Sequence, residues 1–476
     1  MLPQDGLSDS CEFAEGNRLP SQGFKLSRVM RSSYHCSRGN APCGLLWLSH
    51  FGLLLQPSAA LHRISAVKNY MRQEFQIAGA RWLVREIIVG TLLVLCGAPS
   101  LAQQLAGARQ VFDGKMLPDV EVATFERSDT LFPVNIVLRK GPIRPLPSAS
   151  TKLKEIHFNS EGKDYDLFDY LAYNRVAGLL VLKDGKVAFE DYELGIGTET
   201  RWPSFSIAKS FSSTLVGAAL HQGLISSLDD PLTRYVPQLK GGAYEGVSIR
   251  NVLQMASGVK WDETYTDPKS DRRKLLELQL AQKPGAILSY MNALPRAGAP
   301  GSIWNYSTGE SFLVGALIEG ATHKALATYL SETLWSRLGM EQEATWWVES
   351  PGGMGLAGSG LGATLRDYGR FGLFVQQDGV LDGQRIVPEG WFREAGAAHV
   401  IGGKQVDYGY LWWPIPAGDP IHQGAFQGVG IFGQHLYINP SEKLVIVVLS
   451  ARPKPNSSAH ILNDASFFAA VARSLH

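Results

Sequence analysis

Hydrophobic and polar positions predict strands near both ends of residues 103–476 and helices between them. In AGLLVLKDGKVAFEDY, which begins at Ala177, two apolar runs flank Lys183-Asp184-Gly185-Lys186, and Asp-Gly favours a hairpin turn. Residues 433–450 have the same pattern around Asn439-Pro440-Ser441-Glu442. Each segment therefore predicts a β-hairpin, and a helical pattern from His460 to Leu475 follows the second one.

The middle of the chain has the apolar spacing of amphipathic helices. Helices are predicted over residues 211–223, 248–257, 310–322, 324–339 and 365–379. A sheet built from both chain ends, with a helical insert between them, is an α+β arrangement. Residues 151–476 are expected to form this domain. Residues 103–150 contain five prolines and are predicted to be an extended N-terminal arm packed on it.

The segment from Arg81 to Ala102 has the pattern of a secretory signal peptide. Its sequence, RWLVREIIVGTLLVLCGAPSLA, combines a basic flank, a short apolar run and small residues before a cleavage site. A buried helix is the alternative interpretation. Because Met71 lies at the expected distance upstream, we predict that residues 71–102 are the signal peptide and that residues 1–70 are a non-native or dispensable extension. Export to the periplasm or the medium would follow.

Charge and cysteine content change this picture little. The net charge of the chain is +1, and residues 103–476 hold 35 Lys+Arg against 38 Asp+Glu, so nothing indicates binding to nucleic acid. We expect no stable membrane insertion after signal cleavage. All four cysteines precede residue 103, which excludes a disulfide, a thiol nucleophile or a cysteine metal site in the remainder. The sequence predicts no metal and no cofactor, and it leaves the oligomeric state open.

A Ser-x-x-Lys pair at Ser206 and Lys209 is the main candidate for chemistry. It opens a long apolar helix, which places both side chains on one face. A serine hydroxyl needs an adjacent base to become a nucleophile, and a buried lysine with a lowered pKa can supply one. The same Ser-x-x-Lys pattern occurs at Ser65, which precedes the proposed cleavage site, and at Ser257, where no helix pattern begins. Taken alone, the pair is equally compatible with an ordinary helix start.

Two further segments add to this pair. Tyr306 lies in WNYSTGE (304–310), a turn before a predicted helix, where a phenol could relay protons or simply fill the core. Glycines at 424, 428, 430 and 433 precede and open the last hairpin. They would let the backbone approach a ligand closely, or they form a bulge without one.

Together, these motifs resemble the serine β-lactamase and penicillin-binding protein superfamily, in particular its class C-related branch of esterases and 6-aminohexanoate-dimer hydrolases. The resemblance covers roughly residues 170–451. It rests on these segments: LLVLKDGKVAFE, SIAKS, VLQMASGVKWDE (252–263), WNYSTGE, AGSGLGATLRDYGRFG (357–372) and GIFGQHLYINP. It implies an antiparallel sheet flanked by helices, with the site between the sheet and an all-helical region.

The resemblance implies roles for four residues. Ser206 would form an acyl-enzyme, while Lys209 and Tyr306 would share proton transfer. The N–H groups of Ser206 and Ile431 would bind the oxyanion. The substrate would be a small ester or amide.

The sequence departs from the family pattern at two motifs. Gly428-Val429-Gly430 stands where a Lys-Thr-Gly or His-Thr-Gly is usual, and Tyr306-Ser307-Thr308 stands where Tyr-x-Asn is usual. Both changes favour hydrolysis of esters or linear amides. A β-lactamase or D-Ala-D-Ala carboxypeptidase and a non-catalytic penicillin-binding-like sensor remain alternatives.

Three residues are candidates for contact with substrate. Tyr265 and Asp267 lie in ETYTDPKSD (263–271), which is predicted to be a loop and is also compatible with an ordinary surface loop. Gly430 is the third candidate, at the glycine-rich segment. The aromatic run YGYLWW (408–413) predicts either a pocket wall or a core strand.

Overall fold

The computed structural model describes residues 104–456 and 459–476. The predicted extension (1–70) and signal peptide (71–102) lie outside the described residues. In the part of the chain that is described, no helix is both long and apolar enough to cross a membrane.

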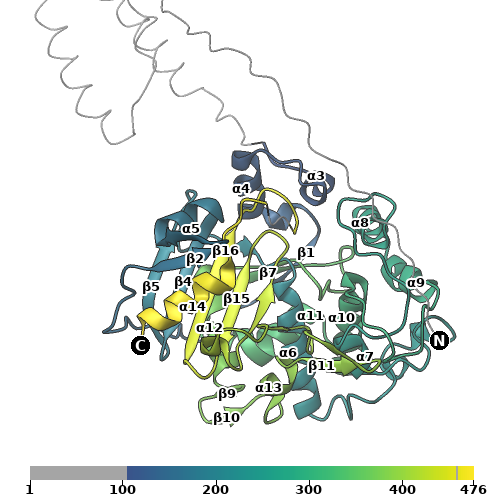
Figure 1. Ribbon diagram of the computed structural model, residues 1–476. Helices are drawn as coiled ribbons and strands as arrows, with labels where there is room; N and C mark the ends of the chain where they lie inside the picture. The colour runs from purple at the N-terminus through teal and green to yellow at the C-terminus, as the bar shows by residue number, and fades with distance from the viewer. Residues whose placement is uncertain (1–103, 457–458) are drawn as a thin grey trace, which may run out of the picture. The chain divides into compact units, whose positions relative to one another are not determined.

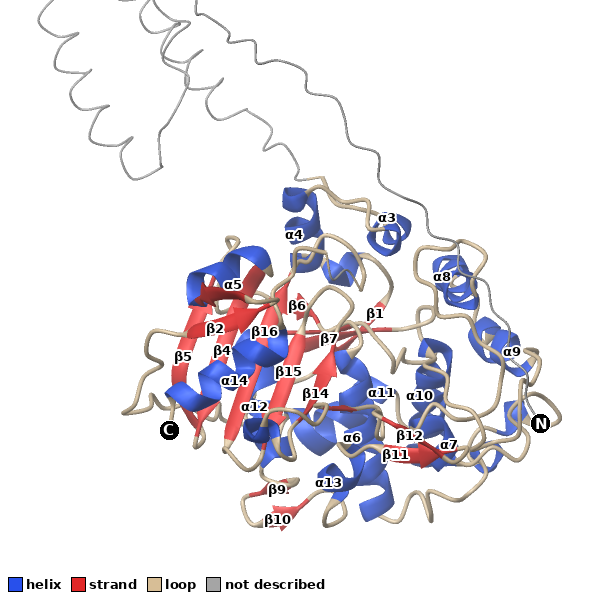
Figure 2. Cartoon of the chain, viewed as in Figure 1, coloured by secondary structure: helices blue, strands red, loops and turns tan. Residues whose placement is uncertain are grey.

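Six antiparallel strands form the main sheet, in the order β13-β14-β15-β16-β4-β5 (Figure 2). Their bounds are β4 (Val176–Lys183), β5 (Lys186–Tyr192), β13 (Trp413–Pro414), β14 (Phe426–Val429), β15 (His435–Asn439) and β16 (Leu444–Ser450). Strand β16 pairs with β4, and Leu444 lies opposite Lys183. The predicted α+β fold, with a sheet built from both chain ends, is thereby confirmed.

The turns of both predicted hairpins follow from local sequence. Between β4 and β5, Asp184 has φ 51° and Gly185 has φ 75°. Two successive positive φ angles define the turn that Asp-Gly favours, because its twist matches that of the paired strands. The second turn lies between Asn439 and Leu444, as predicted.

Helices cover both faces of this sheet (Figure 1). Alternate residues of a strand point to opposite faces. Leu179 and Val181 of β4 share a core with Phe467 of α14 (Asp464–Ser474). Leu180 and Leu182 face the larger core, where they meet α12 (Leu365–Gln376). The near-continuous apolar sequence of β4 reflects this burial on both faces.

A helical region lies beside the sheet. It contains α6 (Ile207–His221), α7 (Ile249–Leu253), α8 (Asp271–Ala281), α9 (Ala286–Asn292), α10 (Thr308–Thr322) and α11 (Leu326–Leu330), which continues as a π-helical turn over Ser331–Trp335. The predicted helices are confirmed in position, although α7 is shorter than expected. Helices α8 and α9 were not predicted: α8 carries many charges, and α9 has only seven residues.

The N-terminal arm needs correction. Residues 104–137 hold α3 (Ala108–Asp113), α4 (Pro118–Glu126) and β1 (Val134–Val137), and only part of the segment from Leu138 to residue 150 is extended. Strand β1 joins a second antiparallel sheet, in the order β1-β7-β8-β6, with β6 (Trp202–Pro203), β7 (Ala344–Trp347) and β8 (Leu361–Ala363). Pro118 is the first residue of α4, and the other four prolines lie just before β1 or in the segment that follows it.

Shorter elements complete the described chain. They are β2 (His157–Ser160), β3 (Lys163–Asp166), α5 (Leu167–Tyr173), β9 (Val380–Leu381), β10 (Gln384–Arg385), α13 (Trp391–Ala395), β11 (His399–Ile401) and β12 (Lys404–Val406). The candidate site lies where α6, the loop before α10 and the end of β14 meet.

Candidate active site

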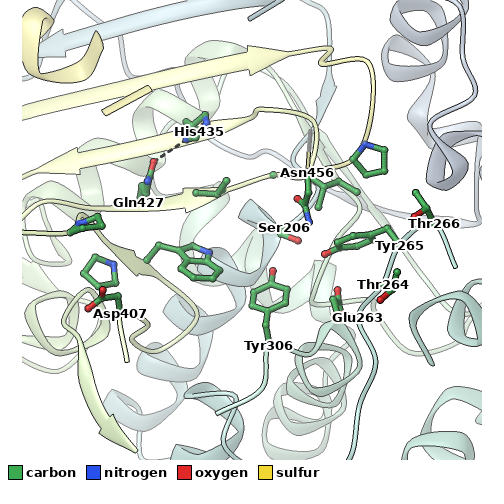
Figure 3. A pocket seen from close by; sticks show the side chains of 17 residues that line it. Ser206, Glu263, Thr264, Tyr265, Thr266, Tyr306, Asp407, Gln427, His435 and Asn456 are labelled. Atoms are coloured by element: carbon green, nitrogen blue, oxygen red, sulfur yellow. Dashed lines mark hydrogen bonds between the residues drawn. The ribbon is translucent and has the colours of Figure 1, made fainter. Parts of the chain in front are cut away.

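Ser206 sits at a sharp turn between β6 and α6. Phe205, directly before it, has φ 42°, a left-handed conformation that is strained for a bulky residue. Its ring is held among aromatic neighbours, with ring centres 5.3 Å from Phe125 and 4.9 Å from Phe432. This packing keeps Ser206 at the N-cap position, directly before α6, with its side chain facing the cavity (Figure 3).

Lys209 is one helical turn further along α6 and is 1% exposed. Its Nζ lies 2.9 Å from Ser206 Oγ, 2.8 Å from the carbonyl oxygen of Gly358 and 3.3 Å from Thr308 Oγ1. Burial lowers the pKa of Lys209 to about 7, and the nearby charge of Glu263 partly opposes this effect. A lysine of this kind can accept a proton near neutral pH.

Tyr306 faces the same serine from the loop before α10 (Figure 3). The Nζ of Lys209 lies 5.2 Å from the centre of the Tyr306 ring. Burial raises the pKa of Tyr306, the charge of Glu263 raises it further, and a hydrogen bond with Ser206 acts in the opposite direction. The phenol is therefore neutral near pH 7 and can pass a proton on, but it does not serve as a phenolate base.

Glu263 was missed as a site residue by the sequence analysis, although it ends the segment VLQMASGVKWDE. Its carboxylate accepts hydrogen bonds from the Thr308 N–H at 2.9 Å, from the Thr308 hydroxyl, and from Trp261 Nε1 at 2.5 Å. Thr308 stands where the family pattern has Asn, and its hydroxyl lies between Glu263 and Lys209. A hydroxyl–carboxylate pair thus fills the place of the missing amide.

Two backbone N–H groups are available at the site. The N–H groups of Ser206 and Ile431 have no acceptor among the described residues, whereas Gly430 N–H donates to the Gln434 carbonyl at 2.8 Å. The Ile431 carbonyl accepts from Asn456 N–H at 2.7 Å, which anchors the backbone next to the Ile431 N–H. Unsatisfied N–H groups beside a nucleophile are suited to binding a developing oxyanion.

A cavity of about 880 Å³ opens over Ser206. Its lining includes Tyr306, Tyr265 and Gly430, so the structure brings most of the predicted residues together. The prediction that Asp267 contacts substrate is wrong. Asp267 is exposed and does not line the cavity, and its Oδ1 accepts a hydrogen bond from the N–H of Lys269 in a local turn. A short polar residue in a loop often closes such a turn on its own backbone.

Aromatic side chains line one side of the cavity. Trp413 stacks on Tyr306 with ring centres 5.6 Å apart, and Tyr408 packs edge-on against both. The run YGYLWW therefore contributes both to the core and to the pocket wall, since Trp412 is buried in the core and Trp413 lines the cavity.

No lysine or arginine of the described chain lines the cavity. Gly428, which stands at the usual place of a cation, packs so closely on α6 that a Cβ atom would lie 2.8 Å from Ser210 Oγ. A side chain at this position would collide with the helix. In the described ranges, 104–456 and 459–476, no cluster of three His, Cys, Asp or Glu residues could hold a metal ion.

The two sheets, the helical region and the Ser206–Lys209 pair between them define an active-site serine hydrolase of the penicillin-recognising type. The family model "Beta-lactamase" matches residues 170–471, well over half of the chain. The protein belongs to this family.

Named relatives agree with this assignment. The chain is 29% identical over 355 residues to the 6-aminohexanoate-dimer hydrolase of Paenarthrobacter ureafaciens, over 70% of this chain and 86% of that protein. A solved Bacillus anthracis structure, provisionally named a 6-aminohexanoate-dimer hydrolase, matches with a TM-score of 0.66 at 24% identity, over 77% of this chain and 96% of that one. A beta-lactamase of Pseudomonas fluorescens is 28% identical over 35% of this chain and 45% of its own length.

Proposed function

We propose that the protein hydrolyses an ester or a linear amide through an acyl-enzyme on Ser206. The observation that carries this proposal is the 2.9 Å contact between Ser206 Oγ and a buried lysine whose pKa is about 7. The similarity to a 6-aminohexanoate-dimer hydrolase supports a linear amide as one substrate class. The substrate is a small molecule, because the cavity above Ser206 has a volume of about 880 Å³.

Acylation begins with the neutral amine of Lys209, which accepts the hydroxyl proton as Ser206 Oγ attacks the substrate carbonyl. The carbonyl oxygen becomes an oxyanion and receives hydrogen bonds from the N–H groups of Ser206 and Ile431. One such donor typically contributes about 10²–10³ in rate.

The tetrahedral intermediate collapses when the leaving group takes a proton. The hydroxyl of Tyr306 donates this proton and regains one from the protonated Lys209, so that the phenol remains neutral throughout. Water then attacks the acyl-enzyme, and Lys209 accepts the proton of the water through Tyr306. Lys209 returns this proton to the oxygen of Ser206, which leaves as the hydroxyl.

The absence of a lysine or arginine from the described residues that line the cavity argues against a β-lactamase or carboxypeptidase. Those reactions commonly use a cation to bind a substrate carboxylate, as the resemblance implies, and Gly428 leaves no room for one. We therefore expect p-nitrophenyl butyrate and the linear dimer of 6-aminohexanoate to be turned over faster than nitrocefin. Nitrocefin turnover that exceeds both by tenfold or more would contradict the proposal.

We also propose that the mature enzyme is exported and begins at Gln103, after the small residues Ser100-Leu101-Ala102. N-terminal sequencing of protein secreted by an expressing bacterium tests this proposal. A mature N-terminus well upstream of Gln103 would contradict it.

A further inference from the structure

A row of polar side chains leads from the cavity into the interior of the sheet. Gln427 on β14 lines the cavity, and its Oε1 lies 2.9 Å from Nδ1 of His435 on β15 (Figure 3). On the far side of the imidazole, Nε2 lies 3.2 Å from Oδ2 of Asp464 at the start of α14. Three elements near the C-terminal end of the chain, β14, β15 and α14, therefore hold one row of groups.

Asp464 is the fixed end of this row. Its Oδ1 accepts hydrogen bonds from Arg452 Nη2 at 2.5 Å, from Tyr170 Oη at 2.8 Å and from Asn174 Nδ2 at 3.1 Å. The positive charges of His435 and Arg452 hold the pKa of this carboxyl well below its usual range, although burial opposes them. An ionised carboxylate can only accept, so the nitrogen of His435 that faces it carries a hydrogen.

His435 connects Asp464 to the amide of Gln427 at the cavity. The ring is 4% exposed, and His435 lies opposite Val429 in the strand register, which makes it a diagonal neighbour of Gln427 on the same face. Nδ1 is the ring nitrogen that faces Oε1 of Gln427. This contact holds the amide of Gln427 in one orientation.

The orientation leaves the Gln427 NH₂ group free. Nε2 of Gln427 has no acceptor among the described residues, and Gln427 lies opposite Trp413 in the pairing of β13 with β14. Trp413 and Tyr306 form an aromatic wall between this amide and Ser206. An acyl chain that lies along this wall would place its far end at Gln427.

We propose that Gln427 is a substrate-binding residue that donates a hydrogen bond to a second carbonyl or carboxylate oxygen at the far end of the acyl chain. His435 is a positioning residue that acts through the amide of Gln427. The preferred substrates are therefore acyl compounds with a terminal amide or acid group, and simple alkyl esters are poorer ones. This inference rests on the proposed function, since it assigns the acyl side of the same site.

A matched pair of esters tests the inference. p-Nitrophenyl butyrate and p-nitrophenyl succinamate differ in one group, a methyl in place of a carboxamide at the end of the acyl chain. We expect the wild-type enzyme to favour the succinamate in kcat/KM, and Gln427→Leu to reduce this preference at least tenfold. Tenfold corresponds to about 1.4 kcal/mol, the size of one hydrogen bond.

Two substitutions of His435 separate positioning from a merely structural role. His435→Phe removes both ring nitrogens and should abolish the preference, whereas His435→Gln keeps a polar group toward Oε1 and should restore part of it. Gln376→Leu makes the same change at a half-buried glutamine outside the cavity and should leave the ratio of the two kcat/KM values unchanged.

The outcomes are distinct. A wild-type enzyme without preference for the succinamate, or a ratio that Gln427→Leu leaves unchanged, overturns the inference even if His435→Phe fails to fold. Labelling of wild-type Ser206 by a fluorophosphonate is measured in parallel. If the label attaches and the ratio does not respond, only the role of Gln427 is wrong; if neither labelling nor hydrolysis occurs, the proposed function fails as well.

Discussion

Lys209 Nζ lies 2.9 Å from Ser206 Oγ, and both side chains are buried. The lysine has hydrogen-bond partners in Ser206, Thr308 and the carbonyl of Gly358, but it has no direct ion-pair partner among the described residues. The protonated form of Lys209 is therefore poorly stabilised, which agrees with its lowered pKa.

The activity of the enzyme should depend on deprotonation of Lys209. Because burial lowers the pKa of Lys209 to about 7, kcat/KM for ester hydrolysis should rise between pH 5 and 8 with a midpoint near 7. Lys209→Arg should lose about 10²–10⁴ in kcat, since guanidinium does not deprotonate in this range. A rate that is independent of pH from 5 to 9 would contradict this role.

Glu263→Gln should move the acidic limb of the pH profile to lower pH. The negative charge of Glu263 raises the pKa of Lys209, so its removal lets that pKa fall further. The amide keeps an oxygen for the N–H of Thr308. The matched control is Glu277→Gln, on the exposed side of α8, where Glu277 pairs with Arg109. This substitution should leave the midpoint of the acidic limb unchanged. An upward shift of the limb in Glu263→Gln would show that the account of Lys209 is wrong.

The N-terminal helix α3 should affect substrate binding through Arg273. Arg273 Nη1 donates to Asp113 Oδ1 at 2.5 Å and to the carbonyl oxygen of Tyr265 at 3.1 Å. Asp113→Ala removes the group that orients the guanidinium under the Tyr265 loop. KM should rise roughly three- to tenfold, which corresponds to about 1 kcal/mol, with a smaller change in kcat. Asp119→Ala, on the exposed side of α4, is the control, and an equal rise in KM there would exclude a specific role for Asp113.

Glu310 should make folding stability depend on pH. Burial raises its pKa to about 8, against a normal value of 4.5, while hydrogen bonds from Ser257 act in the opposite direction. Between these two pH values the unfolded chain releases the proton and the folded protein keeps it, so stability falls as pH rises. The contribution is on the order of a few kcal/mol.

Glu310→Gln removes this dependence and keeps an acceptor for the Ser257 hydroxyl. The difference in Tm between Glu310→Gln and the wild type should therefore become more positive from pH 5 to pH 9. A difference that stays constant over this range would contradict the raised pKa.

The sequence predicted features that depend on neighbouring residues. The Asp184-Gly185 turn and the helix after Ser206 follow from local chemistry, and the predicted sheet from both chain ends follows from the order of apolar segments. The resemblance of the motifs to a known family predicted that one site contains Ser206, Lys209, Tyr306 and Ile431.

Features that depend on tertiary contacts were not predictable in this way. The contact of Glu263 with Thr308 joins residues 45 positions apart, and the approach of His435 to Gln427 depends on strand register. The helices of residues 108–126 bury Phe125 against Phe205, so this segment supports the nucleophile although its prolines suggested an extended arm. Asp267 was misplaced because a loop sequence does not reveal which side chains point inward.

Whether Ser206 is the nucleophile can be decided by intact mass after exposure of the mature protein to a fluorophosphonate. The wild type should gain the mass of one adduct and lose its p-nitrophenyl butyrate hydrolysis. Ser206→Ala should gain none and have no activity to lose. A folded wild type that gains no adduct, or a Ser206→Ala variant that is labelled and still active, would contradict the claim.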